Sequence, residues 1–230
     1  MASPKPWSYT SLSDFVTCPR AFHAKRIAKT VVETRSEQMI WGEQVHKHFE
    51  DRQAVGTPLP PELAAHEPFM LRLEEKPGTM FTEQKVALDL KLKPCHFFDR
   101  DVWYRGVIDY TKVDGESAYI CDFKTGKQHQ KFEQLMTFAL HTFALYPSVQ
   151  LFNAQYYWTI NAATTKKVWG RSEIPAMWAL LIPDLRQYAD AFLTDSWQPR
   201  QSGLCKQRCP VLECEFNGKT NGESYGRRSR

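Results

Sequence analysis

Apolar and β-branched residues are grouped along the chain in a pattern that predicts five β-strands. The strands are expected over residues 80–90, 104–113, 117–124, 149–162 and 166–174. Apolar residues at helical spacing predict helices over residues 129–146 and 175–194. The second helix is expected to turn one face inward, formed by Trp178, Leu181, Leu185, Tyr188 and Phe192. Helices and strands in this order predict an α/β fold with a mixed sheet flanked by helices.

The second and third of these strands are joined by Asp114-Gly115, which is a strong signal for a two-residue hairpin turn. If these two residues form the turn, Asp109 lies opposite Ile120 and is a diagonal neighbour of Asp122 on the same face. Lys124 follows Asp122 by two positions and shares this face, because side chains alternate along a strand. The hairpin is therefore expected to bring two carboxylates and an ammonium together.

Charged side chains inside strands cost free energy unless they are paired or bind a ligand. A ladder of surface salt bridges would explain them, but Val107 and Ile120 are expected on the same face, and an exposed face would be polar throughout. Two carboxylates suit Mg²⁺ or Mn²⁺, with positions left for water and a phosphate. A nearby lysine can orient the attacking water or offset charge on the phosphate. The pattern therefore indicates phosphodiester hydrolysis.

The hairpin resembles the core motif of the PD-(D/E)xK nucleases, in particular their RecB-type branch. Three further segments occur in the order found in that branch, so that the resemblance extends from residue 11 to residue 214. The segments that carry it are Gly106-Val-Ile-Asp109, Asp122-Phe-Lys124-Thr-Gly126, the G-x-x-x-H-x-x-x-E pattern from Gly42 through His46 to Glu50, the Q-x-x-x-Y-like pattern from Gln134 to Phe138, and the cysteine segment from Ser11 to Arg20. Phe138 stands where that branch has a tyrosine.

The resemblance implies a restriction-endonuclease-like core with a metal-dependent active site. The metal ligands that it implies are His46, Glu83, Asp109, Asp122 and the backbone carbonyl of Phe123. Lys124 would orient or activate the attacking water. Gln134 would contact a phosphate or hold a ligand carboxylate, although capping a neighbouring loop explains it nearly as well. Without the resemblance, His46 would be an ordinary helical histidine and Glu83 an exposed strand glutamate.

The six cysteines fall into two groups. Cys95 and Cys121 lie in or beside predicted strands and are expected to be structural. Cys18 and the group Cys205, Cys209 and Cys214 resemble the ligands of the 4Fe-4S cluster in CRISPR-associated and AddB-like exonucleases, where the cluster joins the chain ends. The family commonly has two and then five residues between its last three ligands, whereas this chain has three and four. Zn²⁺ on the four cysteines and unliganded thiols are the alternatives.

Length and composition predict one domain with a substantial core. The chain has 230 residues, of which 42% are hydrophobic, and a net charge of +4. Residues 1–216 are expected to form a nuclease domain with cluster-binding ends, and residues 217–230 a disordered tail whose four basic residues and one acidic residue carry +3 of that charge. The sequence shows neither a signal peptide nor a membrane span, so a cytoplasmic protein is expected, including a phage-encoded one acting in its host.

These observations together predict a metal-dependent DNA exonuclease of the RecB type that prefers single-stranded ends. Trp103, Tyr104 and Trp158 are candidates for stacking unpaired bases, although core packing is the stronger expectation for each. The alternative is a DNA-end-binding accessory protein of a recombination or CRISPR adaptation complex with little nuclease activity of its own. A purely structural iron-sulfur module would leave the charged hairpin unexplained.

Overall fold

The computed structural model describes residues 5–32 and 35–220. The chain divides into two compact units, one of residues 35–179 and the other of residues up to 34 together with those from 180 onward. Helix α6 (Ile174–Thr194) begins in the first of these units and continues into the second.

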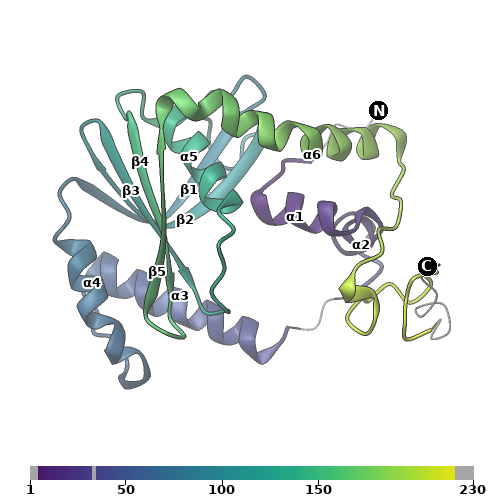
Figure 1. The fold of residues 1–230 in the computed structure, drawn as a ribbon, viewed down its shortest axis with the longest axis horizontal. Coiled ribbons are helices and arrows are strands. Elements are labelled where there is room, and N and C mark those ends of the chain that lie inside the picture. The colour runs from purple at the N-terminus through teal and green to yellow at the C-terminus, as the bar shows by residue number, and fades with distance from the viewer. Residues whose placement is uncertain (1–4, 33–34, 221–230) are drawn as a thin grey trace. The chain divides into compact units, whose positions relative to one another are not determined.

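A five-stranded sheet forms the centre of the unit of residues 35–179 (Figure 1). Its strands are β1 (Thr79–Asp89), β2 (Val102–Asp114), β3 (Ser117–Lys124), β4 (Leu151–Trp158) and β5 (Ala163–Gly170), in the order β1-β2-β3-β4-β5. All neighbours are antiparallel except β3 and β4, which are parallel. Helix α5 (Glu133–Leu145) makes the crossover that a parallel pair requires. The predicted α/β fold and its five strands are confirmed.

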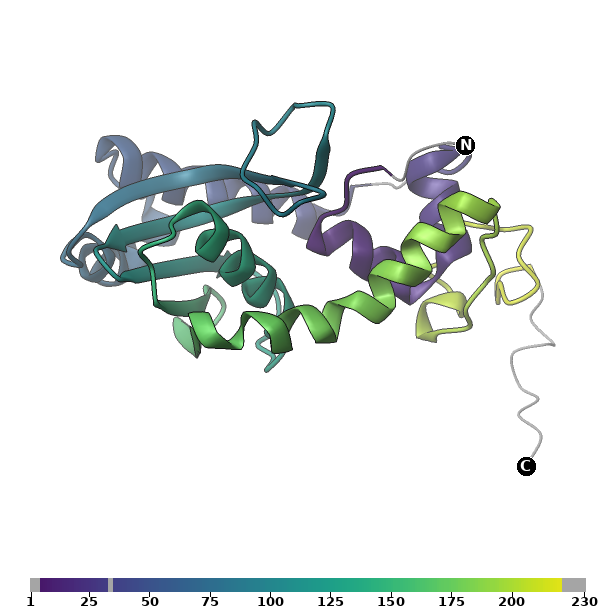
Figure 2. The ribbon, with the colours of Figure 1, turned by 90° about the horizontal axis from the view of Figure 1, so that it is seen from above.

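Helices cover both faces of this sheet (Figure 2). On one face, α3 (Glu37–Val55), the 3₁₀ helix η2 (Pro61–His66) and α4 (Glu67–Glu74) pack against Tyr110, Phe123 and Tyr157. On the other, α5 places the rings of Phe138 and Phe143 against β2 and β4. The pattern of apolar residues had predicted α5 but had given no prediction for η2 and α4.

The β2–β3 turn differs from the predicted one. Asp114 pairs with Ser117, so Gly115 and Glu116 form the turn, and the predicted register was wrong by two positions. Gly115 has a φ of +55°, which suits the first central position of a type II′ turn, where a residue with a side chain would be strained. Continued by one residue, the register sets Asp109 opposite Asp122 rather than opposite Ile120.

The second unit contains α1 (Tyr9–Thr17), α2 (Pro19–Phe22), the π-helical turn η1 (His23–Ile27), the 3₁₀ turn η4 (Gly203–Cys205) and most of α6. An aromatic cluster holds its N-terminal and C-terminal segments together, with Phe15 and Phe22 edge-on to Tyr188. Leu181, Leu185 and Tyr188 are buried, as predicted, whereas Phe192 is half-buried. Trp178, in the other unit, is also half-buried.

The start of the predicted tail is ordered. Asn217 is buried, and its side-chain amide donates hydrogen bonds to the carbonyls of Cys209 and Val211 at 3.2 and 2.8 Å. The rest of the tail, from residue 221, lies outside the described residues. Among the helices of the described residues, each is too short or too polar to cross a lipid bilayer.

Candidate metal-dependent active site

Helix α3 holds His46 against the sheet. The helix begins at a Ser36 cap, whose hydroxyl accepts a hydrogen bond from the backbone of Met39, and it ends at Gly56, which has a φ of +76°. Buried Val45 and Phe49 anchor it. Gly42, His46 and Glu50, the residues of the G-x-x-x-H-x-x-x-E pattern, all line the same cleft.

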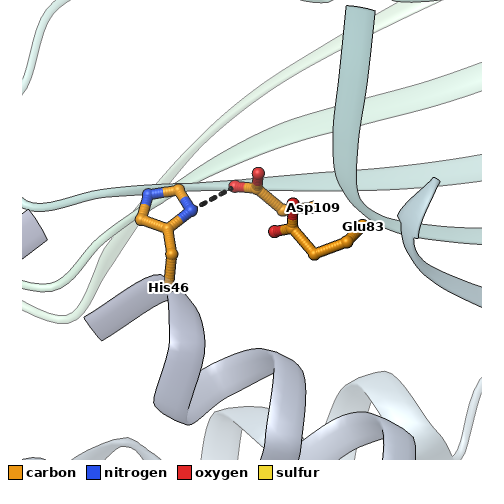
Figure 3. A group of neighbouring side chains, drawn as sticks. All are labelled: His46, Glu83 and Asp109. Atoms are coloured by element: carbon orange, nitrogen blue, oxygen red, sulfur yellow. Dashed lines mark ion pairs between the residues drawn. The ribbon is translucent and has the colours of Figure 1, made fainter. Parts of the chain in front are cut away.

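His46 meets two carboxylates, one from each of the first two strands (Figure 3). The ligand atoms of His46, Glu83 and Asp109 lie within 4.8 Å of one another, and His46 Nδ1 lies 3.3 Å from Asp109 Oδ2. Thr82 pairs with Tyr110 and Gln84 with Ile108, so Glu83 lies between these pairs and opposite Asp109. Glu83 has a φ of +44°, which is strained for a residue with a side chain and is often found at functional sites.

The three side chains line an open cleft of ≈ 720 Å³ together with residues of α3 between Gln38 and Glu50 and with Thr125. Burial raises the pKa of Glu83 to about 7, and the nearby charge of Asp109 adds to this effect. Burial alone would lower the pKa of His46, but the hydrogen bond and charge of Asp109 more than offset it, so the pKa is raised. The cleft therefore favours additional positive charge, which a proton or a cation can supply.

A second group of polar side chains adjoins the first. Asp122 is buried, and its Oδ2 lies 2.5 Å from Lys124 Nζ. Gln134 on α5 bridges the two: its amide nitrogen donates to Asp122 Oδ1, and its oxygen accepts from Lys124 Nζ, both at 3.0 Å. Of the roles considered for Gln134, the structure therefore supports that of holding a carboxylate.

Asp109 links the two groups. The backbone N–H of Phe123 donates a hydrogen bond to Asp109 Oδ2 at 2.7 Å, which ties this carboxylate to β3 between Asp122 and Lys124. Burial raises the pKa of Asp122 to about 6, while the charge of Lys124 opposes the shift. Asp122 is not part of the three-ligand group, and its role as a ligand stays a prediction, as does that of the Phe123 carbonyl.

Comparison with known proteins places these residues in a family. The family model of the PD-(D/E)XK nuclease superfamily matches residues 6–214. This chain belongs to that superfamily. The search of curated proteins gave no significant match.

Solved structures similar to this nuclease superfamily member share its fold at low sequence identity. SSO0001 has a TM-score of 0.50 and 14% identity, with 94% of this chain and 89% of that chain covered. A protein described as a proposed exonuclease, from Eubacterium rectale, has a TM-score of 0.54 and 8% identity, with 99% and 91% covered. These similarities support the fold, and the family match supports a nuclease.

Several residues considered from the sequence lie apart from the site. Tyr104 and Trp158 are buried, and the indole of Trp158 donates to Thr165 Oγ1 at 2.8 Å, so the idea that they stack bases was wrong and the expectation of core packing was right. Trp103 is half-buried beside Trp178. Glu50, by contrast, lines the cleft with His46 and Glu83, and it also accepts a hydrogen bond from Lys47 at 3.1 Å.

Phe138 is buried, and a Cβ on Gly106 would lie 3.1 Å from its ring. Its lack of a hydroxyl therefore suits an apolar contact rather than a polar role. Glu83 is a site residue that only the resemblance had suggested. Apart from the resemblance, Glu83 is recognisable only from its position opposite Asp109, which follows once the β1–β2 register is known.

All four proposed cluster ligands belong to the second unit. Cys18 and Cys205 each accept a backbone N–H at 3.4 Å, from Arg200 and Ser202 respectively. Cys209 and Cys214 pack in a small apolar group with Ala24 and Val211. Within the described ranges no three of these sulfurs come within 4.8 Å of one another, so the structure does not show a closed metal site. Cys121 is fully buried in the core of the other unit, as its structural assignment predicted.

Proposed function

We propose that this protein is a divalent-metal-dependent deoxyribonuclease that hydrolyses DNA progressively from single-stranded ends. The observation that carries this proposal is the link through Asp109. It joins a three-ligand group to a lysine that Asp122 and Gln134 hold in place. A surface salt-bridge ladder has no need of the histidine or of a strained glutamate beside it.

The residues present fit a divalent cation. His46, Glu83 and Asp109 each offer one ligand atom, and the raised pKa of Glu83 reflects a buried carboxylate for which a cation would replace the proton. Oxygen ligands suit Mg²⁺, and the imidazole makes Mn²⁺ equally suitable. When bound, the cation would polarise the scissile phosphate and neutralise charge on it. Asp122 and the carbonyl of Phe123 are proposed as further ligands.

Lys124 is proposed as the catalytic cation of the protein itself. Its ammonium is fixed by Asp122 and Gln134, so it can orient a water or offset negative charge on the phosphate without first losing side-chain freedom. Gln134 acts as a positioning residue, since it contacts both Lys124 and Asp122. Glu83 is the carboxylate that exchanges a proton for a cation most readily near neutral pH, because its pKa is raised to about 7.

The preference for single-stranded ends rests on the resemblance to the RecB-type branch. An accessory role in a recombination or CRISPR adaptation complex is the second candidate, and such partner proteins are compatible with either function. The intact set of Asp109, Asp122 and Lys124 favours catalysis, because a protein that only binds ends has no use for a fixed lysine beside three metal ligands.

The test uses linear and circular single-stranded DNA of the same composition with Mg²⁺ or Mn²⁺. The linear strand should be shortened progressively and the circle should survive, and EDTA should stop the reaction. Lys124→Ala should abolish cleavage without changing the circular dichroism spectrum, whereas Lys167→Ala, at an exposed position on β5, should cleave normally. Rapid cutting of the circle would show endonuclease action, and an active Lys124→Ala would reject the assignment of the site.

We also propose that residues 1–216 act as one nuclease whose ends bind a 4Fe-4S cluster through Cys18, Cys205, Cys209 and Cys214. The support for this proposal is the resemblance of these four cysteines to the cluster ligands of that branch, and Zn²⁺ on the same four thiols is the alternative. The charge of Cys18 also contributes to the raised pKa of Cys214, after burial and other neighbours, which supports a shared site for these two thiols. Protein purified without oxygen should contain about four irons per chain. Stoichiometric zinc without iron would favour the alternative.

A further inference from the structure

The connection between β1 and β2 presents two phenylalanines in a tight turn. The backbone N–H of Asp99 donates to the carbonyl of His96 at 3.0 Å, and the Asp99 carboxylate accepts the backbone N–H of His96 at 2.9 Å. Phe97 and Phe98 therefore occupy the two central positions, where polar residues, glycine or proline are usual. Phe98 is 78% exposed, although burial of a phenyl ring is worth about 2 kcal/mol. The turn is thus costly unless the ring has a partner.

The rest of this connection is held in place by its own hydrogen bonds. Asp89 Oδ1 accepts the backbone N–H groups of Lys91 and Lys93, both at 2.8 Å. Farther along, the N–H of Cys95 donates to the carbonyl of Ala87 at 3.1 Å, so the chain runs back along β1. The two rings are therefore presented by an ordered segment. Figure 2 shows this connection rising from the sheet on the side away from α5.

Two cations from the strands lie against these rings. Lys85 Nζ is 5.7 Å from the centre of the Phe98 ring, and the Arg105 guanidinium is 5.5 Å from that of Phe97. Val86 pairs with Gly106, and a Cβ added to Gly106 would face Phe138 on α5. Lys85 and Arg105 precede these two residues and project from the opposite side of the β1–β2 ribbon.

The cations connect the rings to the metal site. Lys85 follows Glu83 by two residues, and Arg105 precedes Asp109 by four, so they lie roughly 7 and 13 Å along the strands from the proposed ligands. A polyanion that passes from the cleft along the ribbon would meet Lys85 with the exposed Phe98 ring beside it, and then Arg105 beside Phe97. Aromatic rings beside cations are the usual means of holding a single strand, because bases stack on the rings while the cations contact phosphates.

We infer that Phe98, supported by Phe97, Lys85 and Arg105, stacks an unpaired base of the strand whose phosphate lies at the metal site. The inference rests on the proposed function and adds a residue that favours single-stranded over duplex DNA. The bases of a duplex are stacked on each other and present no face to the ring, whereas an unpaired base can leave its neighbour at low cost. The same contact is independent of sequence, since every base has an aromatic face.

The test measures binding of a fluorescent single-stranded oligonucleotide and of a blunt duplex in EDTA, which stops cleavage. Phe98→Ala should weaken single-strand binding about tenfold, equivalent to about 1.4 kcal/mol, with a smaller effect on the duplex. Phe98→Trp should restore it. Leu90→Ala is the matched control, because Leu90 lies in the same connection and is 74% exposed but has no aromatic ring. Leu90→Ala should bind as the wild type does.

The outcomes separate this inference from the proposed function. Suppose that the wild type cleaves DNA with Mn²⁺ and that Phe98→Ala binds single strands as tightly as the wild type. The stacking contact is then rejected, and the proposed nuclease function is unaffected. An equal loss in Leu90→Ala would show that removal of any apolar side chain from this connection weakens binding, and it would also reject the contact. If Phe98→Ala lost as much affinity for the duplex as for the single strand, the stacking contact would be rejected as well. If the wild type neither binds nor cleaves DNA, both proposals fail.

Discussion

Protonation of a single buried histidine should make this protein less stable in mild acid. His141 lies on α5, the helix that carries Gln134, and its side chain is 1% exposed, with its ring 6.1 Å from that of Tyr104. Burial lowers the pKa of His141 to about 4, although the nearby backbone of Ala87 opposes the shift. The native state therefore keeps the ring neutral over a pH range in which the unfolded chain, with a pKa of 6.5, binds a proton.

The size of the effect follows from these two pKa values. Well above pH 6.5 the ring is neutral in both states and contributes no pH dependence. As the pH falls, proton binding to the unfolded state lowers the free energy of unfolding by about 2 kcal/mol at pH 5, and by about 3 kcal/mol once the pH is below 4. Because α5 positions Gln134 beside Asp122, the same change should loosen the site before the fold is lost.

Urea unfolding of the wild type and of His141→Phe at pH 7.5 and pH 5 measures this difference. The wild type should lose about 2 kcal/mol more than the variant between the two pH values, whatever the variant costs at pH 7.5. His96→Gln is the control, because His96 is exposed in the β1–β2 connection. Equal losses in the wild type and in His141→Phe would show that this ring does not stay neutral in the native state, and the argument from burial would then be wrong.

Three further predictions concern the site. Glu83 has a raised pKa of about 7 and must lose its proton to bind a metal. The affinity for Mn²⁺, measured by calorimetry, should therefore rise from pH 6 to pH 8. Glu83→Gln should weaken Mn²⁺ binding and flatten this pH dependence. Gln134→Leu removes two hydrogen bonds to charged groups, so kcat should fall about tenfold to hundredfold with KM nearly unchanged; an unchanged kcat would exclude a positioning role. Mn²⁺ at a hundred times its Kd should stabilise the protein by about 2.7 kcal/mol, and Asp109→Asn should remove most of this gain in a thermal melt.

The strands were predictable because each is a short run of β-branched and aromatic residues bounded by turn signals. The register was not, because Asp114-Gly115 and Gly115-Glu116 are both acceptable turns and only the backbone conformation of Gly115 decides between them. The error was two residues, an even number, so the prediction that Asp109, Asp122 and Lys124 share a face survived it.

Contacts between elements explain the remaining differences. Nothing local to Glu83 indicates a left-handed backbone or a position opposite Asp109, since both depend on how β1 pairs with β2. The layer of η2 and α4 was missed because its helices are short and proline-containing, and its buried residues, such as Leu63 and Met70, become a recognisable face only against the sheet. Sequence patterns identify the residues of a strand more readily than the partners that those residues meet.

The balance of charge in the site explains why the protein tolerates this arrangement. Three carboxylates, Glu83, Asp109 and Asp122, are held near one another by the fold, beside the His46 imidazole and the Lys124 ammonium. The pKa values of Glu83 and Asp122 are raised to about 7 and about 6, so near neutral pH a proton occupies part of the place that a divalent cation would take. Exchange of that proton for a metal relieves the repulsion that burial makes costly, and the free energy saved adds to the affinity for the metal. The strained backbone of Glu83 and the fixed Asp109 are therefore consistent with the proposed function, in which a cation completes the site.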